Sequence, residues 1–295
     1  VINLSNLYHT WQYTQESMRG KSELVKKNSA NQTSSGLDRD YITQWSYGID
    51  ETWTLLVPNT KGGASVPLAQ NEKAMEKANP EFYQIYQQMG QYWGDQPGTS
   101  GPVYVGAFVM MLFVLGLFIV KGPMKWALLA ATVLSVLLSW GRNFMWFTDL
   151  FLDYVPMYAK FRTVASILVI AEFTIPLLAM LALKKVLETE NFLKGTTPLL
   201  VVCREVKNRS WLALSFLLTA GMCVAFAIMP SVFFPDFVSN AELRALASIP
   251  SEYLTPLISN LREIRISIFT ADCWRSFFII LAGTVVLVLA LLKKL

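Results

Sequence analysis

The chain has 295 residues, of which 53% are hydrophobic and only 16% are charged. Soluble domains are roughly 45–50% apolar and about 25% charged, so both values predict a membrane protein. The formal net charge is +4 and the basic residues are spread along the chain, which gives no reason to expect nucleic acid as a partner.

The scarcity of histidine and cysteine excludes several kinds of site. His9 is the only histidine, so neither a histidine-based triad nor a multi-histidine metal cluster can form. Cys203, Cys223 and Cys273 lack the spacing of a zinc or redox site. No glycine-rich stretch has the spacing of a nucleotide-binding loop, and we expect no cofactor. The chain opens at Val1 without a signal-peptide pattern, so we expect an upstream part to be missing.

Residues 1–101 are polar, and we expect this region to lie in water or at the membrane surface. No window in it approaches the roughly 20 apolar residues that cross a bilayer. The stretch NPEFYQIYQQM predicts a short amphipathic helix, because Asn79 stands at the N-cap position and Pro80 at the first helical position. The apolar side chains on one face of this helix are Phe82, Ile85, Tyr86 and Met89.

Five apolar runs follow from Pro102, and each is long enough to cross a bilayer with little tilt. They are Val103–Val120, Trp126–Gly141, Val164–Leu183, Trp211–Met229 and Phe277–Leu292. The sequence therefore predicts a mainly α-helical fold, a polytopic membrane protein with about five transmembrane helices. Basic residues are somewhat more frequent on the inner connections if the N-terminal region lies outside, which favours that orientation.

These runs also predict the domain organisation. We expect an extracytoplasmic region (1–101), transmembrane helices one to three (102–185), an inner connection (186–210), and helices four and five (211–295). Two outer loops interrupt the helices: 142–162, which should re-enter the membrane interface, and 230–275. The second loop carries NAELRALAS and SEYLTPLISNLREIRI, whose apolar spacing predicts helices along the interface. In the inner connection, TTPLLVVC is too short to cross the membrane.

The outer loop 142–162 combines acidic, basic and aromatic residues in one short connection. Asp149 and Asp153 are four residues apart and would share one side of a short helix. A hydroxyl acceptor needs a carboxylate base nearby, which makes Asp153 the best local candidate for a catalytic residue. A solvated and internally paired loop explains the same charges.

Cations flank this acidic pair, and they are the groups that a lipid-borne phosphate needs at headgroup depth. The candidates for binding such a lipid-borne phosphate are Arg142, Lys160, Arg162, Tyr154 and Tyr158. The aromatic members also fit a simpler interpretation, the belt of tyrosine and tryptophan that proteins place at the membrane interface.

Two further pairs of residues, each with at least one charged member, lie in or near the apolar runs. Glu172 falls within the third run, where an ionised side chain is costly unless it is paired or wetted, and Pro176 would open the helix backbone one turn later. A protonated Glu172 that bonds a neighbouring helix is an equally good interpretation. Asp272 and Arg275 are three residues apart and predict a local salt bridge at the start of the fifth helix.

Five segments, read in order, resemble a known family. They are YTQESMRG, WSYGIDETWTLLVPNTKGG, YWGDQPGTSGPVYVGA, LLSWGRN and LDYVPMYAKFRTVASILVI. Together they look like the YfhO family of bacterial multispanning membrane proteins, in a form typical of the Bacteroidetes, from about Tyr13 to Leu183. The residues that match the family's patterns are Tyr154, Pro156, Phe161 and Arg162, then Ser17, Arg19 and Gly20, and finally Tyr104 and Gly106.

The resemblance implies a protein related to the GT-C glycosyltransferases of the bacterial cytoplasmic (inner) membrane. Such enzymes take a sugar from a polyprenyl-phosphate carrier on the outer face and pass it, with inversion, to an envelope glycan or lipid. Their catalytic acid lies in the first outer loop, after the first transmembrane helix. This chain has no apolar helix before its first outer segment, so the region that matches this loop is absent from it.

Two other classes of function stay open. In a transporter or flippase-like protein, Glu172 and Pro176 would line a path at mid-depth in the membrane. In a non-catalytic scaffold, the outer region would bind a protein partner, whose identity the sequence does not indicate. The enzyme needs its essential charge at the outer interface, whereas the transporter needs it inside the helix bundle.

Overall fold

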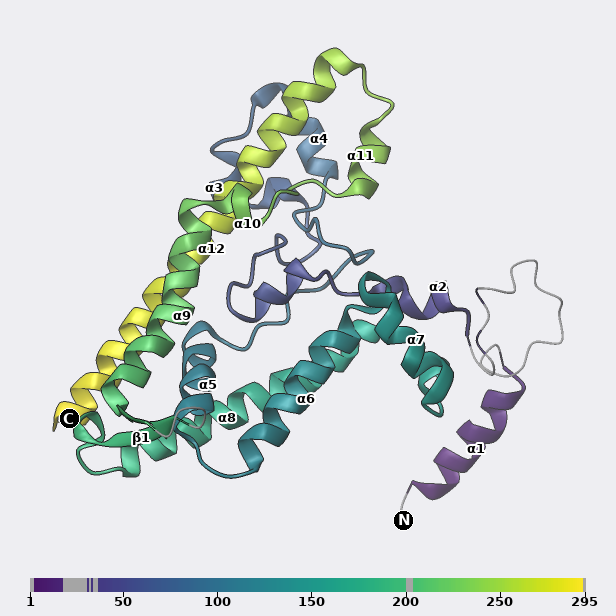
Figure 1. The fold of residues 1–295 in the computed structure, drawn as a ribbon. Coiled ribbons are helices and arrows are strands. Elements are labelled where there is room, and N and C mark those ends of the chain that lie inside the picture. Colours follow the sequence, from purple (N-terminus) through teal and green to yellow (C-terminus); the bar gives the residue numbers. More distant parts are fainter. Residues whose placement is uncertain (1–2, 18–30, 32, 34–36, 200–203, 294–295) are drawn as a thin grey trace. The chain divides into compact units, whose positions relative to one another are not determined.

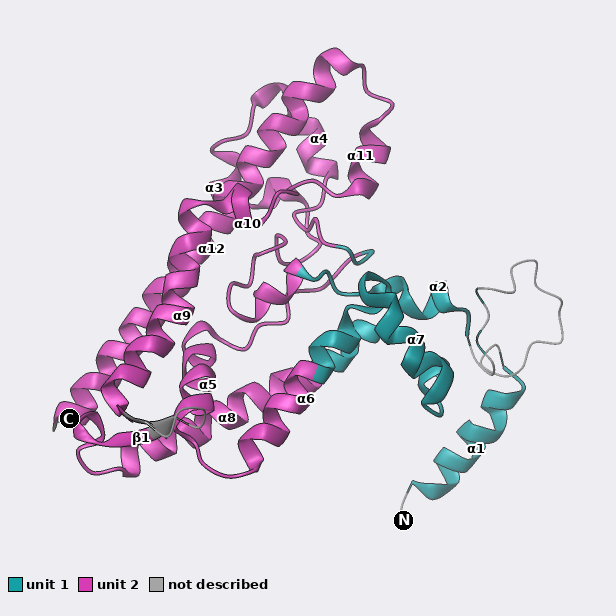
Figure 2. Cartoon of the chain, in the orientation of Figure 1, with its two compact units in different colours: residues 1–49, 95–97, 134–168 teal, residues 50–94, 98–133, 169–295 magenta. Residues whose placement is uncertain are grey.

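The computed structural model describes residues 3–17, 31, 33, 37–199 and 204–293. Its elements are mainly helices, with one two-stranded sheet in the described part of the chain (Figure 1). Contacts divide the chain into two compact units that interleave along the sequence (Figure 2). Unit 1 comprises residues 1–49, 95–97 and 134–168, and unit 2 comprises residues 50–94, 98–133 and 169–295.

Three helices of the described chain are long and apolar enough to cross a membrane, which indicates a membrane protein. They are Val164–Glu188, which includes the 3-10 turn η8 (Val164–Leu168) and α8 (Val169–Glu188), then α9 (Asn208–Ile228), and Ser251–Leu292 of α12 (Ser251–Lys293). A fourth span results if two helices bent by 106° are counted as one. The expectation of five spans is therefore replaced by three or four.

The first predicted span is shorter than its apolar run. Only α5 (Ala107–Ile119) is helical, and its 13 residues reach about 20 Å, less than the roughly 30 Å hydrocarbon core. Gly106 precedes it with φ +97°, and the Ala107 amide donates to the Tyr104 hydroxyl at 2.9 Å. This backbone conformation stops the helix from extending toward its N-terminus.

α5 packs closely against its neighbours in unit 2 because glycines face them. A Cβ on Gly116 would lie 3.0 Å from the Leu178 side chain of α8. A Cβ on Gly283 of α12 would lie 2.4 Å from the Phe108 ring of α5. Small residues at such contacts let helix backbones approach one another, which is the usual basis of helix association in membranes.

The second predicted span ends at a sharp break. α6 (Met124–Ser139) is followed by η6 (Gly141–Phe144) and then by α7 (Met145–Tyr154). Gly141 has φ +43°, and a Cβ there would lie 2.2 Å from Ser46 Oγ and 2.6 Å from Val164 Cγ2. Only glycine fits this position, so the helix direction changes here.

Unit 1 has a small core next to α7. Besides α7, unit 1 contains α1 (Leu4–Gln15), α2 (Arg39–Ile42), η2 (Thr43–Trp45) and η7 (Tyr158–Lys160). The buried members of the core are Leu37, Ile42, Leu152, Ala159 and Val164, with Tyr41, Met145 and Tyr158 packed around them. Through this core, Ile42 of α2 packs with Leu152 of α7 and Ala159 of η7, which both belong to the predicted outer loop 142–162.

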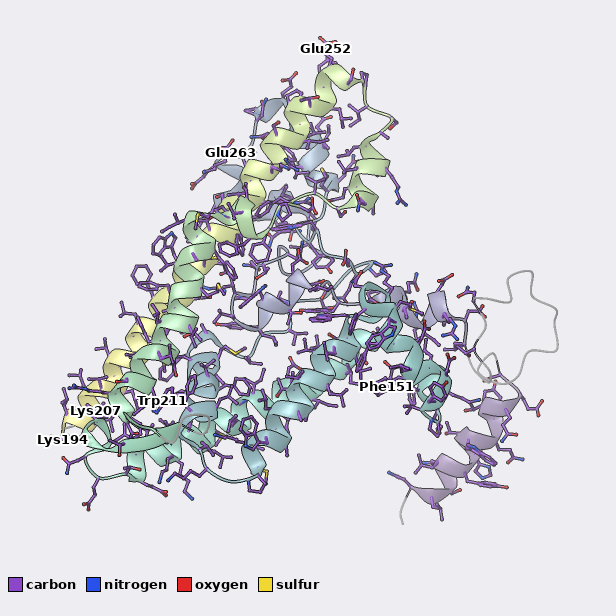
Figure 3. The ribbon with its side chains drawn as sticks, in the orientation of Figure 1. Phe151, Lys194, Lys207, Trp211, Glu252 and Glu263 are labelled. Atoms are coloured by element: carbon purple, nitrogen blue, oxygen red, sulfur yellow. The ribbon has the colours of Figure 1, made fainter. Side chains whose placement is uncertain are left out.

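In unit 2, α12 is too long to lie wholly in a membrane. Its 43 residues extend over about 65 Å, roughly twice the hydrocarbon thickness. The sequence predicted a separate interfacial helix before the fifth span, but the two form one continuous helix, because Pro256 lies near its start and neither proline nor glycine occurs between residues 257 and 282. Glu252 and Glu263 mark its polar half in Figure 3.

The polar half of α12 organises a polar subdomain (residues 50–93 and 230–272). The other elements of this part of unit 2 are η3 (Asp50–Leu55), η4 (Leu68–Gln70), α3 (Glu72–Met75), η5 (Pro80–Phe82), α4 (Tyr83–Gln88), α10 (Pro230–Phe233) and α11 (Asn240–Leu246). Its core includes Leu68, Tyr86, Leu246, Leu257 and Leu261.

Two sequence predictions in this subdomain are confirmed. The Asn79 side chain caps the helix start by accepting from the Glu81 amide at 3.0 Å, and Phe82 and Tyr86 are buried on the predicted face. NAELRALAS forms α11, which begins with a capping box between Ser239 and Glu242.

The connection between α8 and α9 contains a hairpin that the sequence did not predict. β1 (Thr196–Leu199) pairs antiparallel with β2 (Arg204–Lys207). Residues 200–203, which include Cys203, lie outside the described residues. Lys194, which ends the turn before the hairpin, and Lys207, the last residue of β2, are labelled in Figure 3.

Candidate functional site

α7 presents a broad apolar and aromatic face to its surroundings. Trp146, Leu150 and Tyr154 are 70%, 42% and 80% exposed, and their spacing of four residues places them on one stripe. Beside this stripe, Phe147 and Phe151 stand with ring centroids 5.2 Å apart, and Figure 3 labels Phe151 on α7. Because α7 follows the apolar helix α6 directly, such a face suits the membrane interface.

The two acids of α7 occupy the edge of this face and share one cation. Arg39 of α2 forms ion pairs with Asp149 and with Asp153, the second at 2.7 Å. The prediction that both carboxylates lie on one side of a short helix is confirmed. Arg39, more than 100 residues away in the chain, was missed, because no local pattern connects it with α7. Asp153 is thus engaged in an ion pair and not poised as a free base.

Arg162 has a different environment. One of its Nη atoms donates to the Tyr41 hydroxyl and the other to Gln44 Oε1, both at 3.1 Å. The guanidinium also lies over the Tyr41 ring, 4.7 Å from its centroid. All these partners are neutral, and within the described residues Arg162 forms no salt bridge. Its side chain is exposed, so its charge is held in place without being neutralised.

Arg142 is anchored to another segment. It donates to the main-chain carbonyl of Asp95. The side-chain Nδ2 of Asn143 donates to Asp95 Oδ2 and to the Tyr47 carbonyl, each at 2.9 Å. Arg142 and Arg162 therefore do not pair with Asp149 or Asp153. Arg142 holds the turn at Asp95, and Arg162 joins Tyr41 and Gln44.

The remaining predicted residues of the loop differ in exposure. Tyr154 is the most exposed of them, whereas Tyr158 is half-buried against the unit 1 core. Burial raises the pKa of Tyr158 to about 12, so its hydroxyl stays protonated at neutral pH. Lys160 is half-buried in η7, two residues before Arg162.

Glu172 lies in the first turn of α8, because the regular helix begins only at Val169. Its side chain is exposed beside Phe173, which is itself 68% exposed. The buried polar contact near it involves other residues, since the Thr132 and Thr174 hydroxyls lie 2.7 Å apart between α6 and α8. Glu172 is therefore not on the face of α8 that contacts neighbouring helices.

Several residues of the family-like segments have structural roles in unit 2. Lys61 is buried and pairs with Asp50 at 2.5 Å, and Glu51 accepts from the Tyr92 hydroxyl at 2.8 Å. The Asn59 amide donates to Asp272, a residue that also forms the predicted salt bridge with Arg275 at 2.7 Å. The bond from Asn59 joins the segment from residue 50 to residue 63 to α12, and the contacts of Lys61 and Glu51 join this segment to itself and to Tyr92.

Arg19 and Gly20 of the first family-like segment lie outside the described residues. Comparison of the chain with protein-family models, with curated proteins and with solved structures found no match. The resemblance to the YfhO family stays a prediction.

Proposed function

We propose that the chain is the donor-binding part of a membrane glycosyltransferase, in keeping with its resemblance to the YfhO family. In this proposal Arg162 binds the phosphate of a polyprenyl-phosphate-linked sugar. The observation that carries the proposal is the environment of Arg162, an exposed guanidinium oriented by Tyr41 and Gln44 and not neutralised by a carboxylate.

Arginine chemistry supports this assignment. A guanidinium has five N–H donors, and each of the two bonds described above uses one of them. The remaining donors can form the paired charge-assisted bonds with which arginine recognises phosphate. Because Tyr41 and Gln44 already restrict the side chain, binding costs less conformational entropy than it would for a mobile arginine.

The surroundings of Arg162 support a lipid as the source of that phosphate. The loop joins two apolar helices, and the exposed face of α7 carries Trp146, Leu150 and Tyr154. Phe161, next to Arg162, is 66% exposed. A cation beside exposed aromatic and aliphatic side chains suits an amphiphile whose anionic head lies at the membrane interface.

In the reaction we propose, an acceptor hydroxyl attacks the anomeric carbon and the bond from that carbon to the phosphate oxygen breaks. The acceptor proton passes to a carboxylate, and polyprenyl phosphate leaves as an anion that Arg162 stabilises. Asp153 is the candidate within this chain, but its ion pair with Arg39 suits a positioning role. The proposal therefore assigns Asp153 to positioning and assigns donor binding to Arg162.

The proposed setting is the outer face of the bacterial cytoplasmic membrane, with several passes and an extracytoplasmic N-terminal region. The acceptor is an envelope glycan or lipid. The rival idea of a transport path along Glu172 has less support, because that side chain is exposed at the start of α8.

The test is binding of polyprenyl monophosphate to the full chain in phosphatidylcholine nanodiscs, followed by native mass spectrometry. Arg162→Ala should weaken binding at least tenfold, because it removes a charge-assisted contact of roughly 1.5–3 kcal/mol. Arg162→Lys should give an intermediate loss, because lysine keeps the charge without the fork. Tyr41→Phe should weaken binding less, since it keeps the ring and removes one orienting bond.

Arg244→Ala is the matched control, because Arg244 is an exposed arginine on α11 of unit 2. Lys61 is unsuitable as a control, since it is buried in a salt bridge with Asp50. Phosphatidylglycerol in place of polyprenyl monophosphate distinguishes this carrier from any anionic lipid. Equal binding of the carrier by Arg162→Ala and Arg244→Ala would refute the assigned site.

A further inference from the structure

Unit 2 contains an open surface cavity of about 400 Å³ in its polar subdomain. Its lining residues are Val66, Gln70, Asn71, Glu72, Lys73 and Gln91. This volume falls within the range of about 300–1,000 Å³ that is typical of small-molecule sites. All lining residues belong to the same compact unit, and none takes part in the proposed lipid-phosphate site.

Two amide side chains form a fixed wall of the cavity. Gln91 is about nine-tenths buried, and its Nε2 donates to the Gly62 carbonyl at 2.5 Å. Asn71 Nδ2 donates to Gln91 Oε1 at 3.0 Å, while its Oδ1 accepts from the Ala74 amide at 3.1 Å. Both amides are thus held in one orientation before any ligand arrives.

The backbone behind these amides is also fixed. The Leu68 amide donates to the Met89 carbonyl at 2.8 Å, and the Gln91 amide donates to the Val66 carbonyl at 2.7 Å. These bonds flank an isolated antiparallel bridge between Pro67 and Gly90, beside which Val66 and Gln91 lie. The cavity therefore has a preorganised wall, which lowers the entropic cost of binding.

The other polar lining residues are available to a ligand. Gln70, Glu72 and Lys73 are exposed, and within the described residues none of their side chains forms a hydrogen bond or salt bridge. Together they offer an amide, a carboxylate and an ammonium group, and so both donors and acceptors. The positive and negative charges cancel, and Val66 is the one apolar side chain of the lining.

We infer that this cavity binds a neutral saccharide. The Glu72 carboxylate would repel an anionic ligand, and an apolar ligand would cover Gln70, Glu72 and Lys73 without offering them a hydrogen-bond partner. A sugar has hydroxyl groups that donate and accept at once, which matches the mixed lining. The inference does not depend on the proposed function; in a glycosyltransferase this saccharide would belong to the acceptor.

The test uses the full chain in phosphatidylcholine nanodiscs, with maltotriose, mannotriose and chitotriose as separate probes. Saturation-transfer NMR should detect binding of at least one of them in the millimolar range. The double variant E72Q/K73M should weaken that binding at least tenfold. The control E76Q/K77M makes the same chemical changes one turn later, at exposed residues that do not line the cavity, and should leave binding unchanged.

Three outcomes would overturn the inference: no binding of any of the three saccharides, equal weakening by both double variants, or displacement of the bound saccharide by millimolar inorganic phosphate. Arg162→Ala should leave saccharide binding unchanged, so a failure here is distinguishable from a failure of the proposed lipid-phosphate site. Unfolding curves of both double variants, which alter exposed side chains only, should match the wild type.

Discussion

Arg265→Met is expected to destabilise the polar subdomain. Arg265 is fully buried in α12, and its guanidinium makes a bidentate ion pair with Glu242 at 2.5 and 2.9 Å. It also donates to the carbonyls of Phe237 at 2.8 Å and Gly90 at 3.0 Å, and it lies 5.1 Å from the centroid of the Trp93 ring. One side chain thus joins three segments of the subdomain.

The expected loss of stability follows from the Glu242 carboxylate, which Arg265→Met leaves without its arginine partner. Removing one partner of a buried ion pair costs about 3–5 kcal/mol, because the other charge stays buried. Glu242 retains bonds from the Ser239 amide at 2.9 Å and the Ser239 hydroxyl at 3.1 Å, which favours the low end of that range. Methionine fills part of the space, so we expect a loss of about 3 kcal/mol.

Hydrogen exchange of the α11 amides is the appropriate assay, because α11 carries Glu242. A loss of about 3 kcal/mol should increase the exchange of these amides by roughly two orders of magnitude at 25 °C. As a control, Arg262→Met removes an exposed arginine from α12, the helix that carries Arg265, and should change stability by less than about 0.5 kcal/mol. Exchange within threefold of the wild type in Arg265→Met would refute the reasoning.

Two further predictions concern stability. Gly141→Ala should cost about 3 kcal/mol, from the positive φ and from the overlap with Ser46 Oγ. Gly221→Ala in α9 of unit 2, with 3.5 Å to the nearest atom, should be neutral. Protease resistance, measured for the unit that contains each glycine, should fall for Gly141→Ala only. Burial raises the pKa of Tyr86 to about 12, so its stabilising contribution is complete below pH 10 and is lost as pH rises toward 12. Tyr86→Phe should remove that loss, on the order of 2–3 kcal/mol, from urea unfolding curves recorded between pH 10 and 12; curves that keep the same pH dependence would contradict the assignment.

Local signals in the sequence were sufficient for several elements. The Asn79–Pro80 start of a helix, the acid pair on α7 and the salt bridge between Asp272 and Arg275 all depend on residues within a few positions of one another. Helical periodicity and capping chemistry describe such short distances well. The apolar runs likewise indicated a membrane protein with mainly helical structure.

The number of spans and the partners of the site residues could not be obtained in this way. Apolar composition alone does not reveal that Gly106 delays the start of α5 or that Gly141 breaks the helix after α6. It also does not show that the polar and apolar halves of α12 form one helix. The contacts of Arg162 with Tyr41 and Gln44 cross more than 100 residues of chain, and no pattern within either segment predicts them.

Arg162 differs from Arg265 and Arg39 in the charge of its partners, which is why the proposed function depends on Arg162. Arg265 is buried with a carboxylate, and Arg39 is shared between Asp149 and Asp153, so an incoming phosphate would have to displace an existing anion at either position. At Arg162 the partners are a phenol, an amide and an aromatic ring. A phosphate bound there gains the interaction with the guanidinium charge without breaking a salt bridge, and the neutral partners keep the guanidinium oriented while it binds.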